Sequence, residues 1–380
     1  MHDCCVIGGG IIGLSIAREL AGRGLRVRVV AREPHERTAS WAAAGIFPPA
    51  PRFAGVSPGD LLTAWSDELH RAWARELHEE TGIDNGLIAC GGLHVAAADA
   101  GSRLDEEVAE WRRKGARCEP LDERGIVAVE PGLGAAVARG GIAAAYFLPD
   151  EQQIRPPRHL EALVRSCTCR GVELSLDSTV AGFDVRGGAV RGIVTTRRDG
   201  SRETVGAESF VVAAGAWSGQ IAGWFGLDLP TRPIRGQIAL YRFAAPPLQR
   251  VVNLGLEYLV PRPDGRLLVG STLEDAGFDA ATTPTGLNRL ADVARLLLAD
   301  VSSGVVEQSW AGLRPGSVDG LPTVGRLPEV GNAFIATGHF RAGLHQSTGT
   351  AVLIADLVTG EPPGLDPAAF AARPAALTPR

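Results

Sequence analysis

The sequence predicts an α/β protein with a Rossmann-type nucleotide-binding domain and a smaller antiparallel-sheet domain, both discontinuous along the chain. Three observations support this prediction. A glycine-rich turn joins an apolar strand to a helix at the N-terminus. Short apolar strands that end in small residues recur in the middle and near the end of the chain. Stretches typical of antiparallel sheet lie between them.

The first glycine-rich segment, VIGGGIIGLSIA, carries Gly8, Gly10 and Gly13 in the spacing G-x-G-x-x-G. The first glycine permits a tight turn, the second lets the backbone approach a pyrophosphate, and the third lets the helix pack on the strand. Backbone N–H groups at the helix start, at Ile11 and Ile12, can then bind phosphates. The pattern predicts a dinucleotide site. It does not distinguish a nicotinamide from a flavin, and a purely structural glycine turn is the alternative.

The other elements follow from periodicity and turn residues. A strand over 26–31 follows the first helix, which Gly22 and Gly24 end. Small residues within the Ala- and Pro-rich segment 38–51 indicate close approach to a bulky group. A helix over 60–80 comes next and ends at a Thr-Gly pair. Further strands are predicted at 92–96, 143–147, 172–174, 179–183, 210–215, 258–260, 267–270 and 334–338, and further helices at 104–114, 159–166, 288–298 and 351–358.

The order of these elements predicts how the two domains divide the chain, whose 380 residues are enough for two cores. Residues 1–84, 146–228 and 303–380 are expected to form the nucleotide-binding domain. Residues 85–145 and 229–302 are expected to form the smaller domain, which would bind the substrate.

Composition argues for a small-molecule partner. Hydrophobic residues make up 45% and charged residues 21% of the chain, as in ordinary globular proteins. The net charge of -5 and the lack of a Lys/Arg block argue against nucleic acid. We find no signal-peptide pattern and no run of 18 or more apolar residues, so we expect no membrane span and a cytoplasmic location.

The six cysteines are expected to be structural. The pair Cys167 and Cys169 resembles a metal or redox motif only superficially, because no histidine or second pair lies near it in the sequence. We therefore predict no metal site. No cysteine follows Cys169.

With these motifs in place, the chain resembles the flavin-dependent D-amino acid oxidase superfamily and, within it, most closely the glycine oxidases of thiamine biosynthesis. The resemblance spans nearly the whole chain. The segments that carry it are VIGGGIIG at 6–13, AAAGI at 42–46, VVAAGAWS at 211–218, PIRGQ at 233–237, YLVPR at 258–262, WAGLRPGSVDGLPTVGR at 310–326 and GHFRAG at 338–343.

The resemblance implies FAD, held without a covalent bond. Sarcosine-oxidase relatives attach the flavin to a cysteine in the C-terminal part, where this chain has none. A nicotinamide enzyme would not need the second and third cofactor segments. By resemblance, the residues expected at FAD besides the glycine-rich turn are Arg32, Glu33, Ser40, Ala44, Gly45, Ile46, Val180, Gly215, Trp217, Gly338, His339, Phe340, Arg341, Ala342, Gly343 and Leu344.

The ribose-binding acid departs from the usual family pattern. The second strand ends at Ala31, where the family usually has Glu or Asp, but D-amino acid oxidases often have Ala-Arg-Asp there. Glu33 therefore takes the expected role, and a solvated surface acid is the alternative. Arg32 could instead indicate the 2′-phosphate of NADP, but the C-terminal motifs argue against it.

Substrate binding is assigned by resemblance to Arg314 and Tyr258. A planar guanidinium suits bidentate binding of a carboxylate, and the tyrosine hydroxyl donates to the same group. A structural arginine and a core tyrosine are the alternatives. Arg341 is expected near the flavin or the substrate, and Ile46 and Leu273 stand where the family has pocket methionines.

No catalytic acid or base is expected, because the hydride passes directly to the flavin. We expect His339 to pack rather than to act as a base. The N-terminus of the helix after it is expected to face the pyrimidine edge of the flavin and to stabilise negative charge there.

The predicted reaction is oxidation of a small amino acid, glycine or sarcosine first, to an imine that hydrolyses to the keto acid, with oxygen reduced to peroxide. The alternatives are a flavin dehydrogenase of a D-amino acid or cyclic imino acid with another electron acceptor, a non-catalytic flavin-binding protein and, less favoured, a nicotinamide dehydrogenase. A homo-oligomer is expected by analogy alone.

Overall fold

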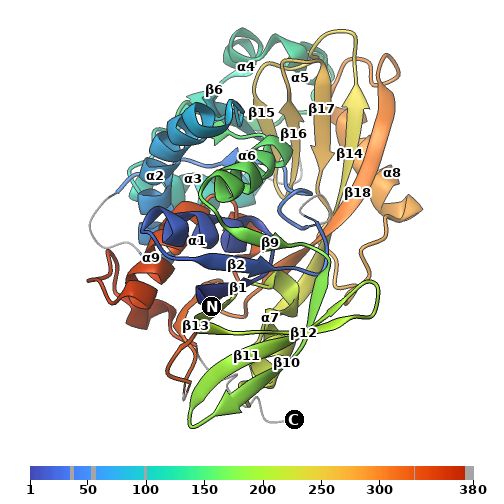
Figure 1. The fold of residues 1–380 in the computed structure, drawn as a ribbon. Helices are drawn as coiled ribbons and strands as arrows, with labels where there is room; N and C mark the ends of the chain where they lie inside the picture. The colour runs from blue at the N-terminus through green and yellow to red at the C-terminus, as the bar shows by residue number, and fades with distance from the viewer. Residues whose placement is uncertain (35–37, 53–56, 98–100, 329, 373–380) are drawn as a thin grey trace, which may run out of the picture.

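The computed structural model describes residues 1–34, 38–52, 57–97, 101–328 and 330–372. It contains a six-stranded and an eight-stranded sheet, with helices packed around both (Figure 1). The predicted α/β fold class is confirmed. Among the described residues, none of the helices combines the length and apolar character needed to cross a membrane.

The six-stranded sheet has the order β19-β20-β13-β1-β2-β9, and all its neighbours are parallel except the pair β19 and β20. The central strands are apolar and buried, as expected for a parallel sheet covered on both faces. Strands from the beginning, middle and end of the chain thus lie side by side. The strands are β1 (His2–Ile7), β2 (Val27–Val30), β9 (Glu173–Ser175), β13 (Ala207–Val212), β19 (Thr323–Arg326) and β20 (Ala333–Thr337).

Four helices pack together over one face of this sheet (Figure 1). They are α1 (Ile11–Gly22), α2 (Pro58–Thr81), α6 (Pro156–Cys169) and α9 (Ser347–Thr359). The helix predicted over 60–80 is confirmed. It begins slightly earlier because the Ser57 hydroxyl accepts the Asp60 N–H at 3.2 Å and Pro58 occupies the first turn.

The other face is covered by a three-stranded antiparallel sheet and a short helix, whose apolar side chains share a core with β1, β2 and β13. These elements are β10 (Ser178–Arg186), β11 (Ala189–Arg197), β12 (Arg202–Val205) and α7 (Ser218–Gly223).

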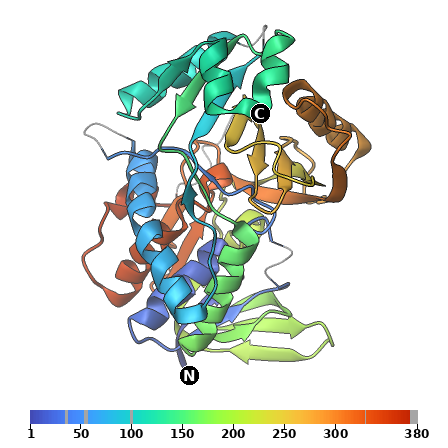
Figure 2. The same ribbon diagram turned by 90° about the horizontal axis from the view of Figure 1, so that it is seen from above.

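The eight-stranded sheet has the order β18-β14-β17-β16-β15-β5-β7-β6. Figure 2 shows the helices that flank it, which lie at the opposite end of the molecule from the sheet of β10, β11 and β12. The strands predicted at 258–260 and 267–270 are confirmed as β16 and β17, which pair antiparallel. The elements are β5 (Gly92–Ala96), β6 (Glu119–Leu121), β7 (Ala144–Leu148), β14 (Arg232–Arg242), β15 (Val251–Leu254), β16 (Glu257–Pro261), β17 (Arg266–Gly270), β18 (Val305–Gly316), α3 (Gly101–Arg113), α4 (Glu123–Val129), α5 (Gly134–Ala138) and α8 (Pro284–Leu297).

The strands of this sheet can be compared with the predicted domain boundaries. The segments 85–145 and 229–302 share it, since β5 pairs with β15. β18 also belongs to it, because it pairs with β14 from Arg232–Gly316 to Arg242–Val305. The predicted boundary had grouped this strand with the nucleotide-binding segments. A small sheet of β3 (Ile46–Phe47), β4 (Ile88–Ala89) and β8 (Gln152–Gln153) completes the strands described here. The two-domain division itself stays a prediction.

The turn between β1 and α1 generates a first prediction. Gly8 has φ +127°, and a Cβ there would overlap the carbonyl oxygen of Ala213 on the neighbouring strand. Gly8→Ala should therefore lower the free energy of unfolding by about 2–5 kcal/mol, from backbone strain plus overpacking, in denaturant titrations of the protein.

Gly24→Ala is the control for strain alone. Gly24 also has positive φ, +86°, but no atom lies within 4 Å of the position that a Cβ would take. Its free energy of unfolding should fall by only about 1–2 kcal/mol, the cost of the left-handed conformation. Equal losses for the two variants would contradict the close-packing argument.

Candidate active site

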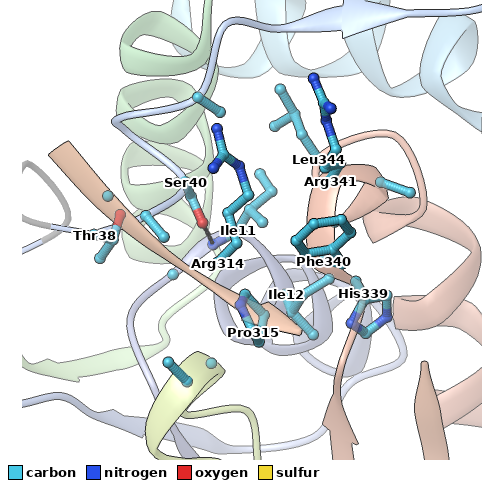
Figure 3. Close-up of a pocket in the computed structure, with 18 of the residues that line it drawn as sticks. Ile11, Ile12, Thr38, Ser40, Arg314, Pro315, His339, Phe340, Arg341 and Leu344 are labelled. Atoms are coloured by element: carbon cyan, nitrogen blue, oxygen red, sulfur yellow. Dashed lines mark hydrogen bonds between the residues drawn. The ribbon is translucent and has the colours of Figure 1, made fainter. Parts of the chain in front are cut away.

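A cavity of about 870 Å³ opens between residues of the two large sheets. Its walls come from the turn after β1, the segment 38–51, the end of β13, the strands β14, β16 and β18, and the turn before α9. Figure 3 shows side chains from the turn after β1, the segment 38–40, β18 and the turn before α9 around this cavity. The cavity is therefore built by parts of the chain that are remote in sequence.

The first turn of α1 forms one end of the cavity. The N–H of Ile11 donates to the Ser40 hydroxyl at 3.0 Å, and that of Ile12 has no acceptor among the described residues. A Cβ at Gly10 would meet only Ser40, at 3.3 Å, so this glycine leaves the backbone open to the cavity. Gly13 does not line the cavity. A Cβ there would overlap the Gly8 carbonyl oxygen, so it allows close helix packing, as expected. These features suit a phosphate.

A second part of the cavity lies beyond β2 and β13. Arg32, Glu33, Val180 and Trp217 all line it. The Arg32 guanidinium lies over the Trp217 ring, 4.4 Å from its centroid, and its Nε is 3.6 Å from a Glu33 oxygen. These four residues, all expected at FAD, are thus brought together by the fold.

The segment 42–46 is held against the cavity by two side chains of the large sheet. The Trp310 indole N–H donates to the Ala42 carbonyl at 3.1 Å, and the buried Arg262 donates to the Ala44 carbonyl at 2.7 Å. Gly45 has φ +78°. Arg262, within YLVPR, is an anchoring residue that the sequence reasoning did not identify.

The turn 338–345 carries the densest set of predicted residues. Gly338 has φ +80° and shapes the turn without lining the cavity. Phe340, at φ +47°, is the one non-glycine residue with positive φ in the described chain. Such strain is typical of functional sites. The N–H groups of Gly343, Leu344 and His345 find no acceptor among the described residues.

These N–H groups lie directly before α9, and the expectation that the N-terminus of this helix faces the flavin stays a prediction. The first turn of α9 packs against α2, where the Ser66 hydroxyl accepts a hydrogen bond from the Gly349 N–H at 3.1 Å. The donors that line the cavity therefore belong to the turn before the helix.

His339 is buried in the wall behind this turn. Its Nε2 lies 3.0 Å from the Thr350 hydroxyl, and its Nδ1 has no partner among the described residues. Burial lowers the pKa of His339 to about 3, so the imidazole is neutral at pH 7. A packing role fits these properties.

The opposite end of the cavity is formed by Arg314 and Tyr258. Arg314 Nη2 donates to the Ser271 hydroxyl at 2.7 Å, and Nη1 lies 3.4 Å from the Thr272 carbonyl. Burial lowers the pKa of Arg314 from its usual value, whereas the neighbouring Tyr258 raises it. The guanidinium stays charged, because arginine deprotonates only far above neutral pH.

Two glycines give these side chains their room. A Cβ at Gly236 would overlap the Arg314 guanidinium, and one at Gly270 would lie 2.7 Å from the Tyr258 ring. Neither glycine was identified from the sequence, although glycine inside a strand often marks a close approach.

Positive charge gathers at this end without a protein counter-ion. Arg341 donates to the Leu256 carbonyl at 3.0 Å, and its charge also lowers the pKa of Arg314. Figure 3 shows both arginines projecting into the cavity from different elements. Neither forms an ion pair with a carboxylate of the described residues. The arrangement suits a small anion such as a carboxylate.

Leu273 lies away from the cavity, contrary to the position expected for it: it is 46% exposed and is not among the lining residues. Ser271 and Thr272 just before it bond to Arg314 and to the Gln237 backbone, and the chain then leaves the cavity. The remaining predicted residues line the cavity as expected: Gly8, Ala44, Ile46, Gly215, Phe340, Ala342 and Leu344.

Other residues line the cavity without any signal in the sequence that marked them for it. They are His94 on β5, Trp111 on α3 and Asn253 on β15. Leu256 and His345 line the cavity too. Within the described residues, no group of three or more His, Cys, Asp or Glu side chains could hold a metal ion.

Comparison with known proteins gives a consistent result. A family described as FAD dependent oxidoreductase matches residues 3–357. Glycine oxidase of Pseudomonas aeruginosa is 36% identical over 370 residues, 96% of this chain and 97% of that protein. A Synechocystis protein named bifunctional protein ThiO/ThiG is 34% identical over 94% of this chain, which spans only 51% of that protein.

Solved structures agree. The crystal structure of glycine oxidase from Geobacillus kaustophilus has a TM-score of 0.88 and 33% identity, and covers 98% of each chain. Glycine oxidase from Bacillus cereus has a TM-score of 0.86 and 26% identity, and covers 99% of this chain and 100% of that one.

The glycine beneath Arg314 generates a prediction for this site. Gly236→Ala should displace the guanidinium and weaken acetate binding by about tenfold or more, measured by calorimetry, because a charge-assisted bidentate contact would be lost. Gly206→Ala is the control, since the atom nearest to where its Cβ would lie, the Arg191 carbonyl oxygen, is 3.6 Å away. Unchanged acetate affinity in Gly236→Ala would count against the assignment of Arg314.

Proposed function

The chain belongs to the family of FAD-dependent oxidoreductases, and from this premise we propose that it oxidises the amine of a small amino acid, glycine or sarcosine first. The resemblance to the D-amino acid oxidase superfamily is confirmed by the family match and by the relatives. The relatives do not favour the alternative dehydrogenase, the non-catalytic flavin protein or the nicotinamide enzyme.

The observation that carries the proposal is the unpaired Arg314 guanidinium beside the Tyr258 ring, in the cavity that also contains the glycine-rich turn. An amino acid substrate brings the carboxylate that this guanidinium lacks. The Ser271 contact fixes one side of Arg314, and the remaining donors are left for a bidentate contact.

The residues present fit FAD. The open backbone at Gly10 and Ile12 suits the pyrophosphate, and the free N–H groups of 343–345 suit a group that carries negative charge. When bound, FAD supplies the acceptor for the hydride that leaves the substrate.

The protein's own task is positioning. Arg314 and Tyr258 hold the carboxylate and thereby fix the neighbouring α-carbon in one orientation, which lowers the entropy lost on reaching the reactive geometry. We assign no residue to proton abstraction. Among the cavity residues, His339 is a weak base because burial holds its pKa near 3.

Several finer points belong to the same proposal. We propose oxygen as the electron acceptor, with peroxide as product, and hydrolysis of the imine to the keto acid. A cytoplasmic location, a homo-oligomer and a place in thiamine biosynthesis remain expectations that rest on resemblance and on the sequence.

Anaerobic addition of glycine to the FAD-loaded protein should bleach the flavin absorbance. Arg314→Lys should lower kcat/KM for glycine by about 10²–10³-fold, because a lysine cannot replace the bidentate contact in a partly buried site. Arg242→Ala is a matched control on β14, where the arginine pairs with Glu307 at 3.0 Å, and should change kcat/KM little.

If glycine, sarcosine, D-alanine and D-proline all leave the flavin of the wild-type protein oxidised, the proposed reaction is wrong.

A further inference from the structure

Three neighbouring strands carry a row of polar side chains along one face of the eight-stranded sheet. Asn253 on β15 stands directly opposite Tyr258 on β16, and directly beside His94 on β5. Residues paired in this way project from the same face of a sheet. All three line the cavity. The row therefore continues the substrate end of the cavity past Tyr258, on the side away from Arg314.

A fully buried carboxylate holds this row in place. Glu151 is 0% exposed, and its Oε1 accepts from Asn253 Nδ2 at 3.0 Å while its Oε2 lies 2.9 Å from His94 Nε2. The absence of a side chain at Gly92 makes the room, since a Cβ there would overlap the carboxylate. Glu151 thus contacts both Asn253 and His94, and Asn253 Nδ2 in turn lies 3.1 Å from His94 Nε2.

This contact fixes the orientation of the Asn253 amide. A carboxylate only accepts hydrogen bonds, so the amide must turn its NH₂ toward Glu151. The Asn253 carbonyl oxygen then points away from the Glu151 carboxylate, and Asn253 is one of the residues that line the cavity. None of the described residues donates a hydrogen bond to this oxygen.

Charge is distributed to match an amino acid. The unpaired guanidinium group of Arg314 lies at one side of Tyr258, and Glu151 lies behind Asn253 at the other. An amino acid with its carboxylate at Arg314 has its nitrogen as the remaining polar group, and that nitrogen carries N–H donors.

We propose that Asn253 accepts a hydrogen bond from the substrate amino group, and that Glu151 and His94 are positioning residues that present the Asn253 oxygen. The inference deepens the proposed function and rests on it. It predicts that the site recognises both ends of the substrate: the carboxylate through Arg314 and Tyr258, and the amine through Asn253.

The test compares two ligands that differ in the amine. The dissociation constant of glycine is taken from the concentration dependence of anaerobic flavin reduction, and that of acetate from its competition with glycine. In Asn253→Ala the glycine constant should rise by about tenfold or more, because a hydrogen bond to a polar or charged group is lost. The acetate constant should stay within about twofold, since acetate has no amine.

A second variant tests the positioning role and guards against misfolding of the first. Glu151→Gln keeps the shape but offers only one acceptor oxygen, so it no longer fixes the Asn253 amide. It should weaken glycine binding less than Asn253→Ala does, and again leave acetate unchanged.

The control is Asn332→Ala, the same chemical change at a partly buried asparagine outside the cavity that bonds the Val190 backbone at 2.9 Å. It should lower thermal stability without changing either dissociation constant. Equal weakening of glycine and acetate in Asn253→Ala and Glu151→Gln, or no weakening of either, would overturn the inference. Failure of glycine to reduce the wild-type flavin would instead refute the proposed function.

Discussion

The structure depends on an uncompensated positive charge held inside a cavity. Arg314 is partly buried, with a hydroxyl, a carbonyl and a phenol around it and no carboxylate partner among the described residues. Burying a charge without a counter-ion is unfavourable, so several contacts from the surrounding sheet must hold the side chain in place. Glycines at 236 and 270 clear the space, and the pairing of β18 with β14 sets the direction of the side chain. The protein is arranged to receive an anion.

The two large sheets explain why this charge lies near a nucleotide site. β18 starts in the eight-stranded sheet at its exposed end and finishes beside the cavity, where Arg314 lies near the segment that Trp310 and Arg262 tether. The turn after β1 and the turn before α9 close the other walls. The buried Glu151 carboxylate lies behind Asn253 and His94, which both line the same cavity. The site is thus polar at both ends, and its polarity comes from strands that are distant in sequence.

Features that depend on residues close together in the sequence could be predicted. The spacing of Gly8, Gly10 and Gly13 reports the strand-turn-helix geometry directly, because each glycine answers a local steric need. Leu273 was placed wrongly because its direction depends on what Ser271 and Thr272 bind across the sheet. Asn253 could not be predicted as a cavity residue, since its neighbours depend on a parallel pairing with a strand about 160 positions earlier. Such long-range pairings leave no periodic signal in a single sequence.

The proposed function depends on where in the cavity a carboxylate binds. The most direct measurement is a crystal structure of the FAD-loaded protein with acetate. We expect the acetate oxygens within hydrogen-bond distance of the Arg314 guanidinium and the Tyr258 hydroxyl, with the Asn253 oxygen facing the methyl end. Acetate bound elsewhere, with Arg314 paired to a carboxylate of the protein itself, would contradict the account.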